Sequence, residues 1–310
     1  MWAKNIRVIE KNIGKTRRAN LSENRNNLAR LVGSAGNHAE RKQLLDRTLR
    51  LERKRGDDVK VASTLRILSD ANRMVHLFRE GIDQAQEALE IYERIGDTNN
   101  QGDSLIKLAW SLYDDRQLDA AEEVAYRAIE LLPEKGQGYR VCQSHRLLGN
   151  VYRSKGQIEE GVQHLETALE IASRFNWNSQ SFWIHHSLAE VFLDEDDFEN
   201  VHLQIDWAKS HAVNEPYLLG RAVLLQADAW RQQGRLEDAR TEALCAFEIF
   251  QKLGAADETR VCKGLLQGIE ERWPASDESD SSSELLEVTP SPTPTNSPLA
   301  CYSSTSDDAP

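Results

Sequence analysis

The sequence is poor in the residues that interrupt helices. Glycine accounts for 17 of its 310 residues and proline for 8, and only two of the prolines precede position 274. A sandwich or barrel of many short strands needs a turn signal about every ten residues, so this scarcity excludes such folds for most of the chain. No apolar run approaches the roughly 18 residues of a membrane-spanning helix, so we expect no membrane span.

Cysteines are also few, and they lie far apart. The four thiols, at positions 142, 245, 262 and 301, have none of the close paired spacings that zinc sites or redox motifs need. We therefore expect no disulfide framework and reduced thiols, as in a protein of the cytoplasm or nucleus.

Basic residues are missing from the end of the sequence. Residues 274–310 contain seven acidic residues and no lysine or arginine. Residues 1–60 carry a net charge of +9 and residues 61–273 one of −14, so the whole chain has a net charge of −12. Because phosphate contacts need a basic face, the acidic bulk argues against nucleic-acid binding as the main activity.

A period of about forty residues runs through the chain. The motif Ala-Leu-Glu-Ile at 88–91 returns at 168–171, and related motifs begin at 48, 128, 208 and 246. Small residues precede these motifs by seven positions, with Val201 as the larger exception, at Gly81, Ala121, Gly161, Val201 and Ala239. A second set lies twelve residues further back, at Ala29, Ser69, Ala109, Gly149, Ala189 and Ala227.

These intervals are typical of paired helices. Offsets of three, four and seven residues lie on one helix face. Small side chains on that face allow two helix axes to approach closely. We therefore predict two antiparallel helices in each period. Gly56-Asp57, Gly96-Asp97 and Gly254 are placed to end the second helix, as a glycine C-cap does.

One copy of the pattern carries a family resemblance. Leu148-Gly149, Tyr152, Gly161 and Ala168 stand at the intervals of the tetratricopeptide repeat signature, which this stretch resembles. About six degenerate copies cover residues 19–253. The usual period of the family is 34 residues, and the longer period here resembles the repeats of kinesin light chains and of STAND signalling ATPases. The resemblance implies an all-α fold, a right-handed superhelical solenoid of helix-turn-helix repeats.

The sequence divides into three parts. Residues 1–18 are predicted to form a basic N-terminal helix, a possible remnant of a preceding repeat. Residues 19–273 form the repeat array, which a capping helix over 257–273 would close. Residues 274–310 are acidic and rich in Ser, Thr and Pro, a composition that predicts disorder. The tail also holds four hydroxyl–proline pairs, which makes candidate phosphosites of Thr289, Ser291, Thr293 and Ser297.

Signatures of catalysis are missing. The segment 14–16 reads Gly-Lys-Thr but lacks the earlier glycine of a phosphate-binding loop. His186 and Glu190 share a helix face, yet the second histidine of a helical metalloprotease motif is absent. His145 and His185 hold matching repeat positions, which favours packing between helices. We therefore expect no enzyme activity, no cofactor and no metal site.

The resemblance also implies a binding surface, because the first helices of tetratricopeptide arrays line a concave face that holds partner peptides. Counted from the small residue of each first helix, the side chains expected in this groove are Arg66, Asp70, Arg73, Trp110, Tyr113, Arg146, Asn150, Arg153, Trp183, His186, Arg221 and Arg231. Arginine beside aromatic residues suits an acidic and apolar peptide. We expect Trp110 and Trp183 to be exposed anchors; the alternative is that they pack against the next repeat.

Part of this set resembles the carboxylate clamp of chaperone-binding cochaperones. Arg146, Asn150 and Arg221 match three of its five positions, whereas Ser187 and Leu225 replace the other two. The resemblance as a whole favours a non-catalytic scaffold or adaptor that binds another protein or peptide, of unknown identity, in its groove, and self-association is possible. The alternative is a regulatory or sensor piece of a STAND-type ATPase lineage, without activity of its own.

Overall fold

Helices joined by short loops are the only regular secondary structure in the described part of the chain. The computed structural model describes residues 26–29, 32–33, 36–131 and 138–272, so the predicted helix over 1–18 and the tail over 274–310 lie outside the described residues. The helices are α3 (His38–Arg55), α4 (Asp58–Met74), α5 (Phe78–Ile95), α6 (Thr98–Asp114), α7 (Leu118–Leu131), α8 (Gly138–Ser154), α9 (Ile158–Arg174), α10 (Asn178–Asp194), α11 (Phe198–His211), α12 (Pro216–Gln232), α13 (Leu236–Leu253) and α14 (Ala256–Glu270).

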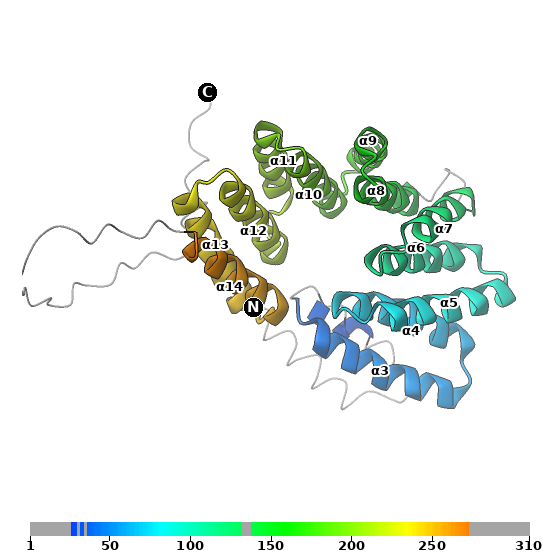
Figure 1. Cartoon of the computed structure of the whole chain (residues 1–310). Coiled ribbons are helices and arrows are strands. Elements are labelled where there is room, and N and C mark those ends of the chain that lie inside the picture. The colour runs from blue at the N-terminus through cyan, green and yellow to red at the C-terminus, as the bar shows by residue number, and fades with distance from the viewer. Residues whose placement is uncertain (1–25, 30–31, 34–35, 132–137, 273–310) are drawn as a thin grey trace, which may run out of the picture.

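Successive helices pack as hairpins, as the forty-residue period predicts. The pairs α4–α5, α6–α7, α8–α9, α10–α11 and α12–α13 are in direct contact. The first helices of neighbouring hairpins also contact one another, from α4 through α6, α8 and α10 to α12, so they form the inner layer of a curved array (Figure 1). The predicted all-α solenoid is confirmed. Helix α14 covers α13 at the end of the array, close to the predicted capping helix.

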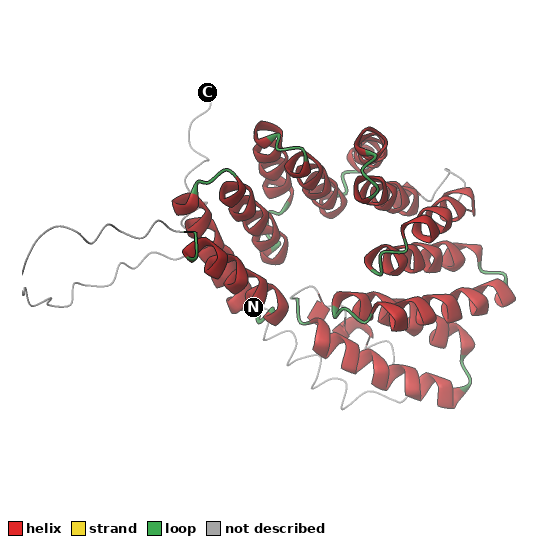
Figure 2. Ribbon diagram, viewed as in Figure 1, coloured by secondary structure: helices red, strands yellow, loops and turns green. Residues whose placement is uncertain are grey.

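Short loops separate successive described helices (Figure 2), and the helix ends follow from short sequence signals. Gly56, Gly96 and Gly254 take left-handed φ angles of 68°, 79° and 73° and end α3, α5 and α13, as predicted. The aspartates at 57 and 97 then cap the following helices, where their side chains accept hydrogen bonds from the amides of residues 60 and 100. None of the described helices is long and apolar enough to cross a membrane.

Some loops place a bulky residue where glycine would be unstrained. The turn between the two helices of a hairpin has a left-handed residue, which is glycine at Gly156 and Gly234 but Arg116 in the α6–α7 turn, with φ of 62°. Left-handed backbone costs an L-residue roughly 1–2 kcal/mol, and the greater freedom of unfolded glycine offsets part of the gain from replacing it.

We predict that Arg116→Gly raises the free energy of unfolding by up to about 1 kcal/mol, because the strain at φ of 62° is relieved. Urea denaturation followed by circular dichroism measures the change. Arg127→Gly, in the middle of α7, serves as control and should lower the stability by about 1 kcal/mol. A loss of stability in Arg116→Gly would show that its side chain contributes more than its backbone costs.

The small residues of the period lie where helices come closest. Gly149 of α8 and Gly161 of α9 face each other: a Cβ atom at either position would lie 3.0 Å from the other residue's carbonyl oxygen. The same hypothetical Cβ at Gly149 would be 2.5 Å from Cγ of Leu165, which is fully buried. Only a residue without a side chain fits there.

The two ends of the array meet. Gly36, just before α3, lies against Tyr217 of α12 and Ala255 before α14, and a Cβ atom at Gly36 would be 2.6 Å from Cβ of Ala255. The ring of His38 packs edge-on against Tyr217, with 6.2 Å between centroids, and its Nε2 is 4.0 Å from a carboxylate oxygen of Glu258. The described helices therefore close into a ring (Figure 1). We call the inner side of this ring, where the two cavities described below open, the lumen.

Candidate functional site

Two adjoining cavities open inside the ring. The first, of about 340 Å³, lies between opposite sides of the ring and is lined by Arg73, Met74, His76, Phe78, Tyr113, Asp114, Arg116, Arg221, Asp257, Glu258 and Val261. The second, of about 330 Å³, is lined by His186, Glu190, Arg221, Leu224, Leu225, Asp228, Val261 and Leu265. Because Arg221 and Val261 line both, the two cavities adjoin at these side chains.

A ladder of alternating cations and aromatic rings crosses the inner helices. The guanidinium of Arg73 lies 5.5 Å from the centroid of Trp110, and that of Arg146 lies 4.5 Å from the same ring. Trp183 follows, with Arg146 and Arg221 each 5.8 Å from its centroid. The five side chains come from α4, α6, α8, α10 and α12, so one is contributed by each first helix. We call this set the Arg–Trp ladder.

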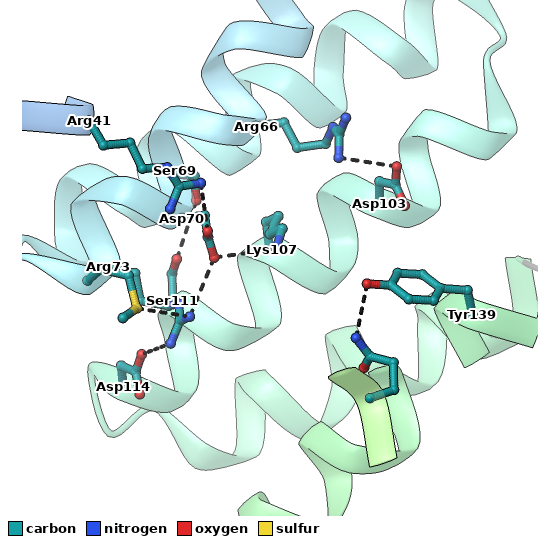
Figure 3. A network of polar contacts seen from close by, with 12 residues as sticks. Arg41, Arg66, Ser69, Asp70, Arg73, Asp103, Lys107, Ser111, Asp114 and Tyr139 are labelled. Carbon is teal, nitrogen blue, oxygen red and sulfur yellow. Dashed lines mark hydrogen bonds and ion pairs between the residues drawn. The ribbon is translucent and has the colours of Figure 1, made fainter. Parts of the chain in front are cut away.

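At its α4 end the ladder is neutralised by carboxylates. Asp70 pairs with Arg41, Arg73 and Lys107 at distances of 3.0, 3.4 and 3.3 Å, and Arg73 also pairs with Asp114 at 2.8 Å (Figure 3). Burial alone would raise the pKa of Asp70, but Lys107, Arg41 and Arg73 outweigh it and hold that pKa well below its usual value. This end is a closed ion-pair network.

The centre of the ladder lacks such neutralisation. Among the described residues, no carboxylate lies within 4.0 Å of the guanidinium nitrogens of Arg146 or Arg221, and the Nε of each is buried without a hydrogen-bond partner. Burial, and then the nearby charge of Arg73, lower the pKa of Arg146 to about 10. Neither guanidinium is neutralised by a described carboxylate, so both could pair with an anionic ligand.

The other predicted groove arginines are already paired. Arg66 contacts Asp103 at 3.2 Å, and Arg153 bridges Glu190 and Asp194 at 2.7 and 2.6 Å. A third, Arg231, pairs with Asp228 one turn away on its own helix. These cations have partners before any ligand arrives, which separates them from Arg146 and Arg221.

The aromatic side chains are less exposed than expected. Trp110 is only 8% exposed, because Arg146 lies over its ring and Tyr113 packs edge-on against it. The expectation that Trp110 is exposed is therefore wrong, and the alternative, packing against the next repeat, is observed. Trp183 is half-buried and remains accessible in part. Asn150 and His186 are 5% exposed, and the side-chain carbonyl oxygen of Asn150 is buried without a partner.

Sequence reasoning missed several residues of the ion-pair network around Asp70 and of the cavity linings. Lys107 lies one helical turn before Trp110, a spacing that would have placed it on the same face. Arg41 comes from α3, a second helix, and joins the inner ion-pair network through Asp70 of the neighbouring helix α4. Val261 and Leu265 belong to α14, which therefore lines the cavities as well as covering the end of the array. Val261 lines both cavities, and Leu265 lines the second.

The histidines hold the hairpins together. As expected from their repeat positions, His145 contacts His164 within the α8–α9 hairpin at 2.9 Å, and His185 contacts Gln204 within α10–α11 at 2.7 Å. Within the described ranges, no group of three or more His, Cys, Asp or Glu side chains is arranged to hold a metal ion.

Comparison with known proteins agrees with this architecture. A family model of the tetratricopeptide repeat matches residues 144–175, the α8–α9 copy that carries the clearest signature in the sequence. No curated protein sequence matches the chain.

Solved structures of low sequence identity share the fold. A Rap protein complexed with competence and sporulation factor has a TM-score of 0.65 and 16% identity, with 87% of this chain and 80% of that chain covered. The quorum sensor NprR from B. thuringiensis, in its apo form, has a TM-score of 0.56 and 14% identity, with 86% and 81% covered.

A third similar structure is a signal-transduction ATPase with numerous domains and a tetratricopeptide repeat sensor, from Pyrococcus horikoshii. It has a TM-score of 0.54 and 14% identity, with 86% of this chain but only 41% of that chain covered. Together, the family model and these folds identify residues 144–175 as a tetratricopeptide repeat, within an array of the tetratricopeptide-like repeat type.

Proposed function

We propose that this chain is a non-catalytic protein-interaction scaffold whose lumen binds an acidic, partly apolar peptide. The observation that carries the proposal is the pair Arg146 and Arg221, two cations on the same tryptophan that have no carboxylate partner among the described residues. Apolar side chains for the rest of a peptide line the second cavity together with Arg221, at Leu224, Leu225, Val261 and Leu265. Arg146 lies across Trp183 from Arg221.

The energetics favour an anionic ligand. A buried charge without a partner destabilises a fold, and hydrogen bonds to charged groups contribute about 1.5–3 kcal/mol each. The contacts with Trp110 and Trp183 hold the two guanidiniums in place before binding, so little side-chain entropy is lost when a carboxylate arrives. A peptide carboxylate would supply the anionic partner that Arg146 and Arg221 lack among the described residues.

Two structural neighbours support this class of function. One is a Rap protein complexed with competence and sporulation factor, and another is a quorum sensor. The chain spans at least four fifths of each of them, so the likeness includes the whole curved array and not one repeat alone.

The test is a binding measurement with short synthetic peptides in which Glu and Leu alternate, and with matched peptides carrying Gln in place of Glu. We predict that Arg146→Gln/Arg221→Gln weakens binding of the acidic peptides by about 100-fold or more, since each lost charge-assisted contact contributes about 1.5–3 kcal/mol and 1.4 kcal/mol is tenfold. Fluorescence anisotropy of labelled peptides gives the dissociation constants.

The matched control removes two positive charges from outer helices. Arg127→Gln/Arg174→Gln alters exposed side chains of α7 and α9 that pair with Glu93 and Glu170, and peptide affinity should stay within about twofold. If both double variants lose affinity equally, long-range charge explains the binding and the lumen is not the site. If the neutral Gln peptides bind as well as the acidic ones, the proposed ligand chemistry is wrong.

A further inference from the structure

We propose that the lumen is occupied in cis by the acidic segment Glu284–Val288 of this chain's own tail, which a partner peptide must displace. The inference rests on the proposed function, since it assigns a first occupant to the same site. It is argued from charge, from the spacing of two glutamates and from the short distance between the end of α14 and the lumen.

Charge complementarity points to the tail. Residues 274–310 contain seven acidic residues and no lysine or arginine, so every charged side chain in this segment is negative. The segment is therefore complementary to Arg146 and Arg221, which have no carboxylate partner among the described residues. Within this stretch, Glu284-Leu285-Leu286-Glu287-Val288 combines carboxylates with three apolar side chains. No other acidic part of the tail has that combination, because Asp277-Glu278-Ser279-Asp280 and Asp307-Asp308 lack neighbouring large aliphatic residues.

The spacing of the two carboxylates fits the two free cations. In a polyproline II conformation, residues three apart share a face about 9 Å apart. The guanidiniums of Arg146 and Arg221 each lie 5.8 Å from the Trp183 centroid, so they are at most about 12 Å apart. Glu284 and Glu287 can therefore approach both cations at once, with the intervening leucines beside the apolar lining of the second cavity.

The stretch between the end of α14 and Glu284 is long enough to reach the second cavity and short enough to keep the segment near it. Leu265 of α14 lines the second cavity, and α14 ends five residues later at Glu270, about 8 Å along the helix axis. The stretch from Glu270 to Glu284 spans about 20 Å on average as a flexible linker and at most about 46 Å fully extended. A tethered ligand at this distance has an effective concentration in the millimolar range.

The decisive experiment uses the full chain and a fluorescein-labelled peptide of residues 280–290 as the probe. We expect Glu284→Lys/Glu287→Lys to bind the probe at least tenfold more tightly than the unaltered chain, because the lumen is vacated. The matched control, Asp307→Lys/Asp308→Lys, makes the same charge change elsewhere in the tail and should bind the probe as the unaltered chain does. Equal affinity of all three for the probe would overturn the inference.

A second measurement locates the segment directly. A benzophenone photo-cross-linker at position 286 should give products on α10, α12 or α14, and Arg146→Gln/Arg221→Gln should abolish them. Mixing isotopically light and heavy chains separates the two origins: products within single chains support the inference, and products between chains contradict it.

The two proposals fail in different ways. If Arg146→Gln/Arg221→Gln abolishes binding of acidic peptides while Glu284→Lys/Glu287→Lys changes nothing, the lumen binds acidic peptides but the tail does not occupy it. If the vacated variant binds neither the probe nor the alternating Glu–Leu peptides, the proposed function itself is wrong, and this inference is wrong with it.

Discussion

Gly149→Leu is expected to lower the free energy of unfolding by about 3 kcal/mol or more. A Cβ atom at this position would already lie 2.5 Å from Cγ of Leu165 and 3.0 Å from the carbonyl oxygen of Gly161. Leu165 is fully buried, so it cannot move aside without leaving its own packing. Overpacking of this kind costs typically 1–3 kcal/mol and more where backbone must shift. Denaturant titration with the circular dichroism signal measures the loss.

The same substitution elsewhere should have the opposite sign. Gly264 lies in α14 with open space around it, so Gly264→Leu removes only the entropic cost of a helical glycine and should stabilise by up to about 1 kcal/mol. Equal effects of the two substitutions would mean that α8 and α9 do not pack through Gly149 and Gly161.

Acid is expected to destabilise the array by about 5 kcal/mol between pH 7 and pH 4.5. Burial lowers the pKa of His145 and His186 to about 4, with smaller contributions from His164 at the first and from nearby arginines at the second. In the unfolded chain these groups titrate near 6.5, so between about 6.5 and 4 the unfolded state binds more protons. Stability is therefore full above pH 6.5 and falls as the pH is lowered through this window.

Urea titrations at the two pH values test the origin of this effect. His186→Gln should reduce the pH dependence, because one buried imidazole no longer has to be protonated on unfolding. His76→Gln, at an exposed loop position, should leave it unchanged. If the free energy of unfolding of the unaltered chain stays constant down to pH 4.5, burial does not lower the pKa of these imidazoles in the folded state, and the prediction is wrong.

The architecture was predictable because it depends on spacing along the chain. Small residues at 81, 121 and 161, and again at 109, 149 and 189, define which helix faces meet, and every one of these positions is buried. Glycines at 56, 96 and 254 ended the helices as predicted. These spacings and capping residues depend on neighbours along the chain, so they can be recognised from the sequence without knowledge of the tertiary contacts.

The candidate site was predictable only as a face. Periodicity placed Arg146, Arg153 and Arg221 on the same inner surface, but it could not tell that Arg153 has two carboxylate partners and the other two have none. Trp110 was expected to be exposed for the same reason, because the burial by Arg146 comes from the next hairpin. Contacts between helices forty residues apart depend on the curvature of the array, which no spacing along one helix determines.

Gly36 packs against Ala255 and Tyr217, so the two ends of the described array are in contact, unlike the ends of an open solenoid. In an open solenoid each terminal unit can fray independently, since it has one neighbour. Here the first and last of the described units are neighbours, so we expect fraying at one end to remove contacts from the other and unfolding to become cooperative around the ring. Insertion or deletion of a single hairpin would alter the arc length and separate the ends, which fixes the permissible number of hairpins.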